Sequence, residues 1–259
     1  MTSAHSMQSE SVALHTALRA AALALLLIVL GGCQTGKQLQ PPTALTAPYD
    51  RPELWAVVPF ANESGVSHVQ GDRVADIFAE QIEQVSGLHA LPVNRVILAM
   101  RQLGMRSVDS PDDAIALLQV LGADALIVGT VTSYDPYPPP KLGAALQLFR
   151  NPMAMPSSRF DPVAFTRAST DEVAPGAIAS ASSISQAAGV FDATNHQTLQ
   201  WLDEYAAGRS EPDSAYGRRI YQVSMELYTQ FVAHRLMRDL LECERARLTP
   251  MAIQTTTRR

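Results

Sequence analysis

The sequence has few cysteines, no excess of charge of one sign and none of the short motifs that carry most enzyme chemistry. Its 259 residues include two cysteines, Cys33 and Cys243, and 20 basic against 25 acidic residues, which gives a formal net charge of −5. Because there is no basic excess, we expect no nucleic-acid partner. A glycine-rich phosphate loop, a Cys-x-x-Cys pair, a His-Glu-x-x-His motif and a Gly-x-Ser-x-Gly elbow are all missing. We therefore expect neither an enzyme nor a bound cofactor or metal.

A long apolar run is missing as well. The run from Ala20 to Leu30 is shorter than the roughly 20 residues that a transmembrane helix needs, and it has the length of a signal-peptide core. It leads into Leu30-Gly31-Gly32-Cys33, which resembles a bacterial lipobox. The resemblance implies that signal peptidase II recognises Leu30, Gly31 and Gly32 and cuts before Cys33, which carries the lipid. The alternative is a buried helix that merely ends at these residues.

A lipobox would divide the chain at Cys33. Residues 1–32 are then the signal peptide, 33–53 a lipidated cysteine with a proline-rich tether, 54–245 one α/β domain and 246–259 a polar tail. By the sorting rule of enteric bacteria, Gln34 after the cysteine favours the periplasmic face of the outer membrane. Lipidation leaves Cys243 as a free thiol, which we expect to be half-buried; disulfide dimerisation is the alternative.

Alternating strand and helix patterns in the first half of the domain predict an α/β layer. Apolar runs indicate strands at 54–60, 88–92 and 123–132. Apolar residues at helical spacing indicate helices at 72–85, from an Asn94 cap to Leu103, and from a Ser110 cap to Leu121. The last helix also has a proline in its first position and acidic residues in its first turn, where the helix dipole favours them.

The second half of the domain is less regular. Residues 134–140 are rich in proline and predict a stiff connector, whereas 142–149 alternate as a strand does. A loop insertion is expected at about 150–183. After it we expect a β-hairpin, with strands at 184–191 and 198–202 and Asn195 in a left-handed turn position. One long helix then runs from Ser214 to about Glu244, with a buried stripe that includes Ile220, Val223, Leu227 and Phe231.

Three segments, at 56–62, 121–131 and 190–194, together resemble a superfamily of periplasmic lipoproteins. It includes the curli secretion channel subunit, a penicillin-binding protein activator lipoprotein and the N-terminal domain of TolB, the Tol-Pal β-propeller protein. The resemblance implies a TolB N-terminal-like α/β (α+β) fold, with a single mixed sheet of about five or six strands, packed helices and a long C-terminal helix. It also implies a non-enzymatic domain that docks on an envelope protein or on copies of itself.

Surface aromatics next to proline give the best candidate for a docking site. Tyr134, Tyr137, Pro138, Pro139 and Pro140 would form a rigid, partly apolar rim, and such groups bind with little ordering cost. The alternative is a packed crossover with no partner.

One pair of polar residues and one single carboxylate are candidate chemical sites. A pair formed by Asp192 and His196 could act as a metal or acid/base site, although a solvated turn is the simpler interpretation. Asp124 lies at a strand edge and is expected to serve a turn or a cap.

Taken together, these patterns predict an outer-membrane-anchored periplasmic lipoprotein that acts as a non-enzymatic accessory, scaffold or activator. Its partners would be the membrane, through the lipid anchor, and an envelope or periplasmic protein, with a homo-oligomer also possible. One alternative is a subunit of an oligomeric export or transport assembly, in which 151–183 insert into the membrane or line a ring. The other is a lipid-anchored hydrolase whose polar residues converge only in space.

Overall fold

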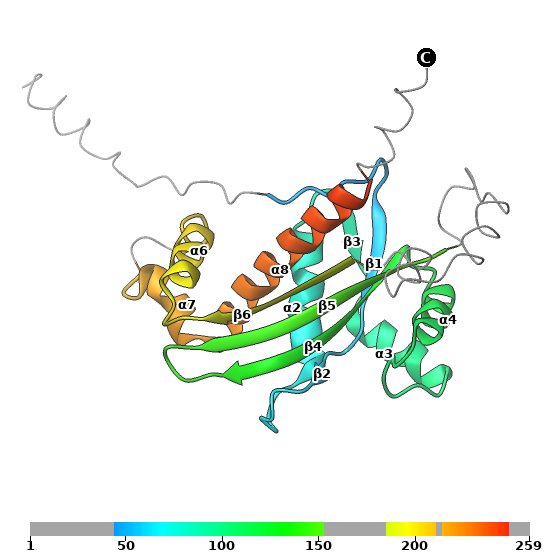
Figure 1. The fold of residues 1–259 in the computed structure, drawn as a ribbon, viewed down its shortest axis with the longest axis horizontal. Coiled ribbons are helices and arrows are strands. Elements are labelled where there is room, and N and C mark those ends of the chain that lie inside the picture. The colour runs from blue at the N-terminus through cyan, green and yellow to red at the C-terminus, as the bar shows by residue number, and fades with distance from the viewer. Residues whose placement is uncertain (1–43, 153–184, 211–213, 249–259) are drawn as a thin grey trace, which may run out of the picture. The chain divides into compact units, whose positions relative to one another are not determined.

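A computed structural model describes residues 44–152, 185–210 and 214–248, which form a six-stranded mixed sheet covered by helices (Figure 1). The strand order is β3-β1-β4-β5-β6, and β2 pairs with β4 beside this path. β1, β3 and β4 run parallel to one another, whereas β5 is antiparallel to both of its neighbours. The strands are β1 (Glu53–Val57), β2 (Ala61–Asn62), β3 (Leu88–Ala90), β4 (Ala125–Asp135), β5 (Lys141–Arg150) and β6 (Ser185–Asp192).

Helices pack on both faces of the sheet, and the two faces form separate apolar cores. Successive strand residues point to opposite faces, so Trp55 and Val57 enter the core with α2, α6 and α8, while Ala56 and Val58 enter the core with α3 and α4. Burial on both faces explains why β1 and the start of β4 are unbroken apolar runs. The helices are α2 (Gly71–Glu83), α3 (Val93–Gln102), α4 (Pro111–Leu121), α6 (His196–Ala206), η1 (Gly217–Arg219), α7 (Ile220–Val223) and α8 (Met225–Leu248).

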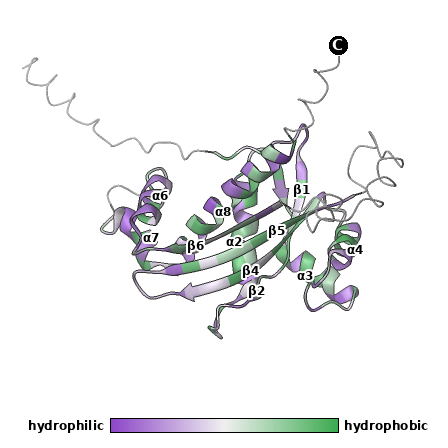
Figure 2. Cartoon of the chain, in the orientation of Figure 1, coloured by the Kyte–Doolittle hydropathy of each residue, from purple (hydrophilic) through white to green (hydrophobic). Residues whose placement is uncertain are grey.

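The long C-terminal helix α8 is two-faced, with hydrophobic and hydrophilic segments alternating along it (Figure 2). Its apolar positions, among them Phe231, Leu236 and Leu240, are buried against the sheet. No helix within the described ranges is long and apolar enough to cross a membrane. The mixed six-stranded sheet and this helix confirm the predicted fold class.

The predicted β-hairpin after β6 is wrong, because residues 196–206 form helix α6. Asn195 is the N-cap of that helix and not a left-handed turn residue: its φ is −82°, and its side chain accepts hydrogen bonds from the backbone amides of Gln197 and Thr198. Thr198, Leu202 and Tyr205 are buried at helical spacing. The helical period therefore outweighs the strand propensity of the short segment 198–202.

The long C-terminal helix is also interrupted where one continuous helix was predicted. Ser224 has extended backbone angles, φ −106° and ψ 112°, which separate α7 from α8. The predicted buried stripe fails at Val223, which is 48% exposed. A smaller error concerns α3, which begins at Val93, so that Asn94 lies inside the helix and does not cap it.

Candidate docking surface and its anchorage

The tip of the β4–β5 hairpin presents the proline-rich segment to solvent. The two strands pair up to Asp135 and Lys141, and residues 136–140 make the loop between them. Asp135 Oδ1 accepts a hydrogen bond from the Tyr137 amide at 3.1 Å, which orders the start of the loop. The Tyr137 side chain is 77% exposed, and an aromatic side chain so exposed is typical of an interaction site.

The tip faces the short helices η1 and α7 across a hollow of about 540 Å³. Tyr216 and Val223, which line the hollow, are 59% and 48% exposed. The hollow is lined by Pro138, Pro139, Ala215, Tyr216, Arg219, Gln222 and Val223. Sequence reasoning missed its α7 side, because the break at Ser224 that exposes Val223 lies inside an otherwise helical pattern.

A polar brace holds the base of the tip. Lys141 Nζ lies 2.7 Å from Asp192 Oδ2, and Asp192 Oδ1 accepts hydrogen bonds from the amide and hydroxyl of Thr194. The hydrogen bond from Lys141 and those from Thr194 lower the pKa of Asp192 to about 2. The Ala193 amide also donates to the carbonyl of Pro140 at 3.0 Å, so the loop is attached to the end of β6.

The five residues predicted as one docking rim do not all lie together. Tyr137, Pro138 and Pro139 share the exposed tip, whereas Pro140 is buried. Tyr134 is a half-buried residue of β4 whose ring meets His68 edge-on at 5.7 Å, and burial raises its pKa. The candidate docking surface therefore consists of Tyr137, Pro138 and Pro139 with Tyr216 and Val223, and we name it the tip surface.

A buried charge network lies at the other end of β5. Arg150, the last residue of this strand, donates to both carboxylate oxygens of Glu53, at 3.0 and 2.5 Å, and its guanidinium lies 3.5 Å from Glu244 Oε2. The Trp55 indole also donates to Glu53 at 3.0 Å. Arg150 is 4.6 Å from the centroid of the Tyr49 ring, over which it stacks.

Glu244 joins this network to the N-terminal segment of the described chain. Its fully buried carboxylate accepts hydrogen bonds from the Tyr49 hydroxyl at 2.7 Å, from the Ser185 hydroxyl and from two nitrogens of Arg247 at 2.8 Å. Burial works to raise the pKa of Glu244, but the hydrogen bonds from Arg247, Ser185 and Tyr49 outweigh burial and lower it. Burial, followed by the charge of Glu244, raises the pKa of Tyr49.

These contacts fix residues 44–52 on the domain, although their sequence suggested part of a tether. The Ala47 amide donates to Ser86 at 3.0 Å and the Ser86 amide donates to Leu45 at 2.9 Å. Further along, Arg51 pairs with Asp124 at 2.6 Å. Asp124 also accepts the Leu54 amide at 2.9 Å, so this carboxylate has a structural role beside the start of β4.

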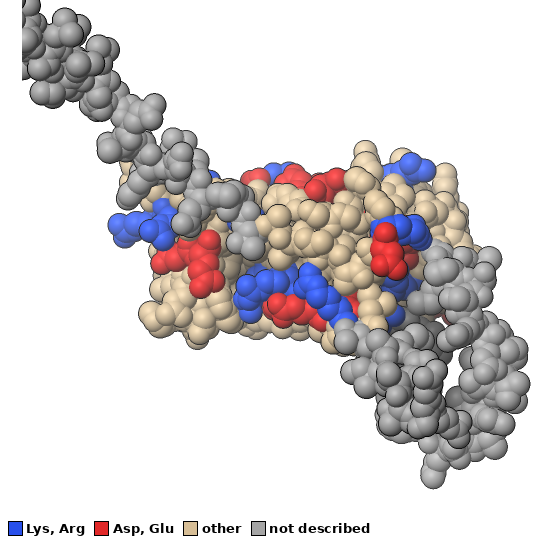
Figure 3. Space-filling model, turned by 90° about the horizontal axis from the view of Figure 1, so that it is seen from above, with Lys and Arg blue, Asp and Glu red and all other residues tan. Residues whose placement is uncertain are grey.

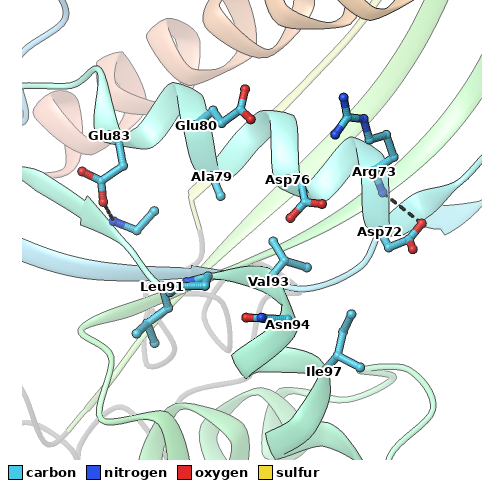
Figure 4. A pocket seen from close by; sticks show the side chains of 12 residues that line it. Asp72, Arg73, Asp76, Ala79, Glu80, Glu83, Leu91, Val93, Asn94 and Ile97 are labelled. Carbon is cyan, nitrogen blue, oxygen red and sulfur yellow. Dashed lines mark hydrogen bonds between the residues drawn. The ribbon is translucent and has the colours of Figure 1, made fainter.

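A cavity of about 660 Å³ between α2 and α3 is the place where acidic side chains gather (Figure 4). Asp72, Asp76, Glu80 and Glu83 line it, together with apolar side chains from α3. Glu83 accepts the Ala90 amide at 2.6 Å and Asp72 accepts the Arg73 amide at 2.9 Å, so two of the four carboxylates serve the backbone. The lining contains no histidine, cysteine or serine that could act as a nucleophile or base beside them.

The remaining polar candidates lie apart from one another. Asp192 binds Lys141 and Thr194, while His196 lies at the exposed start of α6 beside Gln200, so the suggested pair is not formed. The prediction of a half-buried Cys243 is wrong, because its thiol is exposed; it lies 3.5 Å from the Gln186 carbonyl. Within the described ranges, no group of three histidine, cysteine, aspartate or glutamate side chains could hold a metal ion.

Basic and acidic side chains lie in mixed groups on the face shown in Figure 3, and neither sign dominates it. This agrees with the small net charge of the sequence. The lipobox residues Leu30, Gly31, Gly32 and Cys33 lie outside the described residues, and so do residues 153–183 of the insertion expected at about 150–183.

Comparison with known proteins finds similar solved structures but no matching family. No protein-family model matches the sequence, and no curated protein matches it significantly. Among solved structures, the lipoprotein GNA1162 from Neisseria meningitidis is similar, with 21% identity over 46% of this chain and 93% of that chain and a TM-score of 0.31. The C-terminal domain of LpoB from Salmonella enterica is 16% identical over 42% of this chain and 76% of that domain, with a TM-score of 0.30.

A third similar structure is the PelC dodecamer from Paraburkholderia phytofirmans. It is 16% identical over 43% of this chain and 66% of that chain, with a TM-score of 0.25. At TM-scores of 0.25–0.31 and identities of 16–21%, these similarities carry no conclusion about this chain.

Proposed function

We propose that this chain is a lipid-anchored periplasmic accessory protein that docks on another envelope protein through its tip surface. Cys33 carries the lipid at the periplasmic face of the outer membrane, and the α/β domain acts by binding and not by catalysis. The observation that carries the proposal is the tip surface itself: Tyr216 and Val223, which line the hollow, are 59% and 48% exposed, and Tyr137, which precedes the lining residue Pro138, is 77% exposed. Grouped exposed apolar side chains of this kind mark interaction sites.

The position of the tip surface supports docking away from the membrane. The N-terminal segment is fixed by the network around Arg150, at one end of β5, and the tip lies at the other end of the same strand, beside Lys141. Nine residue steps of about 3.4 Å separate the two ends by roughly 30 Å. Between Cys33 and residue 44 the chain spans eleven steps, or at most about 40 Å.

Metabolic labelling with a palmitate analogue tests the anchor. The wild-type chain should be labelled and should fractionate with membranes, whereas Cys33→Ala should lose the label. Cys243→Ala serves as the matched control, because it removes the other cysteine and should keep the label. Equal labelling of the wild type and Cys33→Ala would refute lipidation at this residue.

Photo-crosslinking in intact cells tests the docking surface. A photo-reactive amino acid in place of Tyr137 should give a discrete adduct with the partner protein. The same amino acid in place of Arg106, which is exposed outside the tip surface, should not give that adduct. Val223→Glu should abolish the Tyr137 adduct, since it places a charge in the hollow. An adduct that forms equally from both positions would contradict docking at the tip.

The alternative of an oligomeric export assembly depends on residues 151–183, of which 153–183 lie outside the described ranges. Native mass in detergent separates the two proposals. A discrete oligomer that persists after Val223→Glu would favour the assembly, and a monomer would favour the accessory role.

A further inference from the structure

A second hollow, on the face formed by α6 and α8, is lined by three arginines. Arg209 follows α6, and Arg235 and Arg238 lie on α8. Together with His234 they line a cavity of about 120 Å³. This cavity adjoins another of about 240 Å³, because Leu45, Arg209 and His234 line both.

The guanidinium groups retain donors that no described residue uses. Arg235 Nε and Nη1 and Arg238 Nε are buried without a hydrogen-bond partner among the described residues. Asp239 lies 3.5 Å from Arg235 Nε and Glu242 lies 3.9 Å from Arg238 Nε, but neither makes a hydrogen bond there. Among the described residues, Arg209 donates one side-chain hydrogen bond, to the Tyr205 carbonyl at 3.1 Å.

Aromatic rings hold two of the guanidinium groups in place. Arg235 stacks over Trp201 and Arg209 stacks over Tyr205, each at 4.1 Å from the ring centroid. Stacking fixes the plane of a guanidinium while leaving its edge free to donate. Glu204 is the one carboxylate in the lining, so the cavity carries more positive than negative side chains.

The adjoining cavity contains an unpartnered acceptor. Gln81 is 3% exposed and lines this cavity, and its side-chain oxygen has no hydrogen-bond partner among the described residues. A buried acceptor without a donor costs stability unless a ligand or water supplies one. The two joined cavities thus offer several donors for an anion at one end and an acceptor for a hydroxyl at the other.

We propose that Arg209, Arg235 and Arg238 bind the phosphate group of a phosphate ester, whose alcohol part donates a hydroxyl hydrogen bond to Gln81. Arginine forks suit phosphate, which offers several acceptor oxygens and more than one negative charge. The ligand is either a lipid headgroup of the phosphatidylglycerol kind or a soluble glycerol phosphate. Leu45 lines both cavities and lies twelve residues after Cys33, so under the proposed lipid anchor the site stays within about 43 Å of the membrane.

Titration calorimetry on the full chain, purified in a non-ionic detergent, tests the site with inorganic phosphate and glycerol 3-phosphate. Both should bind saturably, and glycerol 3-phosphate should bind several-fold more tightly. Arg235→Gln with Arg238→Gln should weaken both at least about tenfold, as expected for lost charge-assisted hydrogen bonds. Gln81→Leu should remove only the preference for glycerol 3-phosphate.

A charge-matched control replaces Arg95 and Arg101, which are exposed on α3, with glutamine and should leave binding within about twofold of wild type. Arg238→Gln alone guards against misfolding, because this side chain is already 38% exposed. Burial, followed by the charges of Arg209 and Arg238, lowers the pKa of His234 to about 4. A bound anion should raise it, which NMR titration would detect.

Vesicle sedimentation separates the two sources of phosphate. It uses the full-length Cys33→Ala chain with phosphatidylcholine vesicles, with and without phosphatidylglycerol. A preference for phosphatidylglycerol that disappears in the arginine double variant identifies the headgroup as ligand, whereas binding of glycerol 3-phosphate without that preference identifies the soluble ester. No saturable binding of any probe, or equal binding by the arginine variants, would overturn the site. Neither result would affect the labelling of Cys33.

Discussion

Glu244 is the residue whose removal should most disturb the attachment of the N-terminal segment. Its carboxylate is fully buried and receives hydrogen bonds from Tyr49, Ser185 and Arg247. Replacing it with alanine removes the carboxylate that Arg247 and Arg150 share, while both guanidinium groups stay largely shielded from water. It also leaves the Tyr49 hydroxyl without its acceptor. The perturbation therefore affects α8, β5 and the N-terminal segment together.

The magnitude follows from the cost of breaking a buried ion pair from one side. Such changes cost about 3–5 kcal/mol, because the remaining charge loses its partner and cannot regain full hydration. Whole domains are stable by only about 5–15 kcal/mol, so the loss is a large fraction of the total. With a urea m-value of about 2 kcal/mol per M, the unfolding midpoint of Glu244→Ala should fall by about 2 M.

The assay is urea unfolding followed by circular dichroism, together with hydrogen exchange of the Ala47 and Glu53 amides. The Ala47 amide donates to the Ser86 carbonyl and the Glu53 amide to the Gly87 carbonyl. Both should exchange faster in Glu244→Ala, because the hydrogen bond from the Tyr49 hydroxyl to Glu244 that holds this segment is lost. Glu242→Ala is the matched control, since its side chain is 61% exposed and should contribute less than about 1 kcal/mol. If the two variants unfold alike, the network does not hold the segment.

Three smaller predictions concern pH, capping and packing. The pKa of His234 is about 4 in the folded protein and 6.5 in the unfolded chain. The contribution of neutral His234 to the free energy of unfolding should therefore be fully present above pH 6.5 and be lost as the pH falls towards 4, by about 1–2 kcal/mol after solvent screening. His234→Gln should make the free energy of unfolding less dependent on pH over this range. Ser110→Ala removes a capping box and should cost about 1 kcal/mol in thermal unfolding, whereas Ser107→Ala, which is exposed, should cost nothing measurable. Gly71→Ala places a methyl group 2.0 Å from the Phe60 carbonyl oxygen and should cost about 1–3 kcal/mol or more, measured in the same way; an unchanged melting temperature would mean that the backbone shifts freely there.

The elements that the sequence predicted correctly are those whose residue pattern lies within one short stretch of the chain. The capping box at Ser110 is an example: the Ser110 hydroxyl accepts a hydrogen bond from the Asp113 amide at 3.2 Å, and the Asp113 carboxylate accepts one from the Ser110 amide at 3.1 Å. The apolar run at 125–128 predicted a central strand for a similar reason, because neighbours on both faces require apolar side chains.

The errors arose where two local patterns compete. Residues 198–202 contain a β-branched and an aromatic residue and are too short to show a helical period by themselves. The deciding contacts come from Tyr205, which packs against Tyr221 and Phe231 and lies outside the segment that suggested a strand. The Asn195 cap was visible in the sequence, but the same residue type also favours turns.

The candidate sites could be predicted only in part, because they depend on pairs far apart in the chain. The sequence predicts the docking role of Tyr137 beside three prolines, but it does not predict that Pro138 and Pro139 line a hollow together with Tyr216. Glu53 and Arg150 are 97 residues apart, and Tyr49 and Glu244 are 195 apart, so no spacing rule brings them together. A buried carboxylate is costly unless paired, and isolated acidic residues in a sequence do not reveal their partners.

Under the proposed function, the sheet explains how the anchored segment and the docking surface can lie apart within this domain. A lipid anchor alone leaves a domain free to rotate about its tether, so the tip surface would face the membrane as often as the periplasm. The network around Arg150 and Glu244 removes part of this freedom, because it fixes the N-terminal segment to the end of β5 that lies opposite the tip (Figure 1). If Arg235 and Arg238, which line a cavity together with Leu45, also bind a lipid headgroup, then α8 carries both the headgroup site and the contacts that hold the N-terminal segment. Loss of Glu244 should then weaken docking at Tyr137 without altering a single residue of the tip surface.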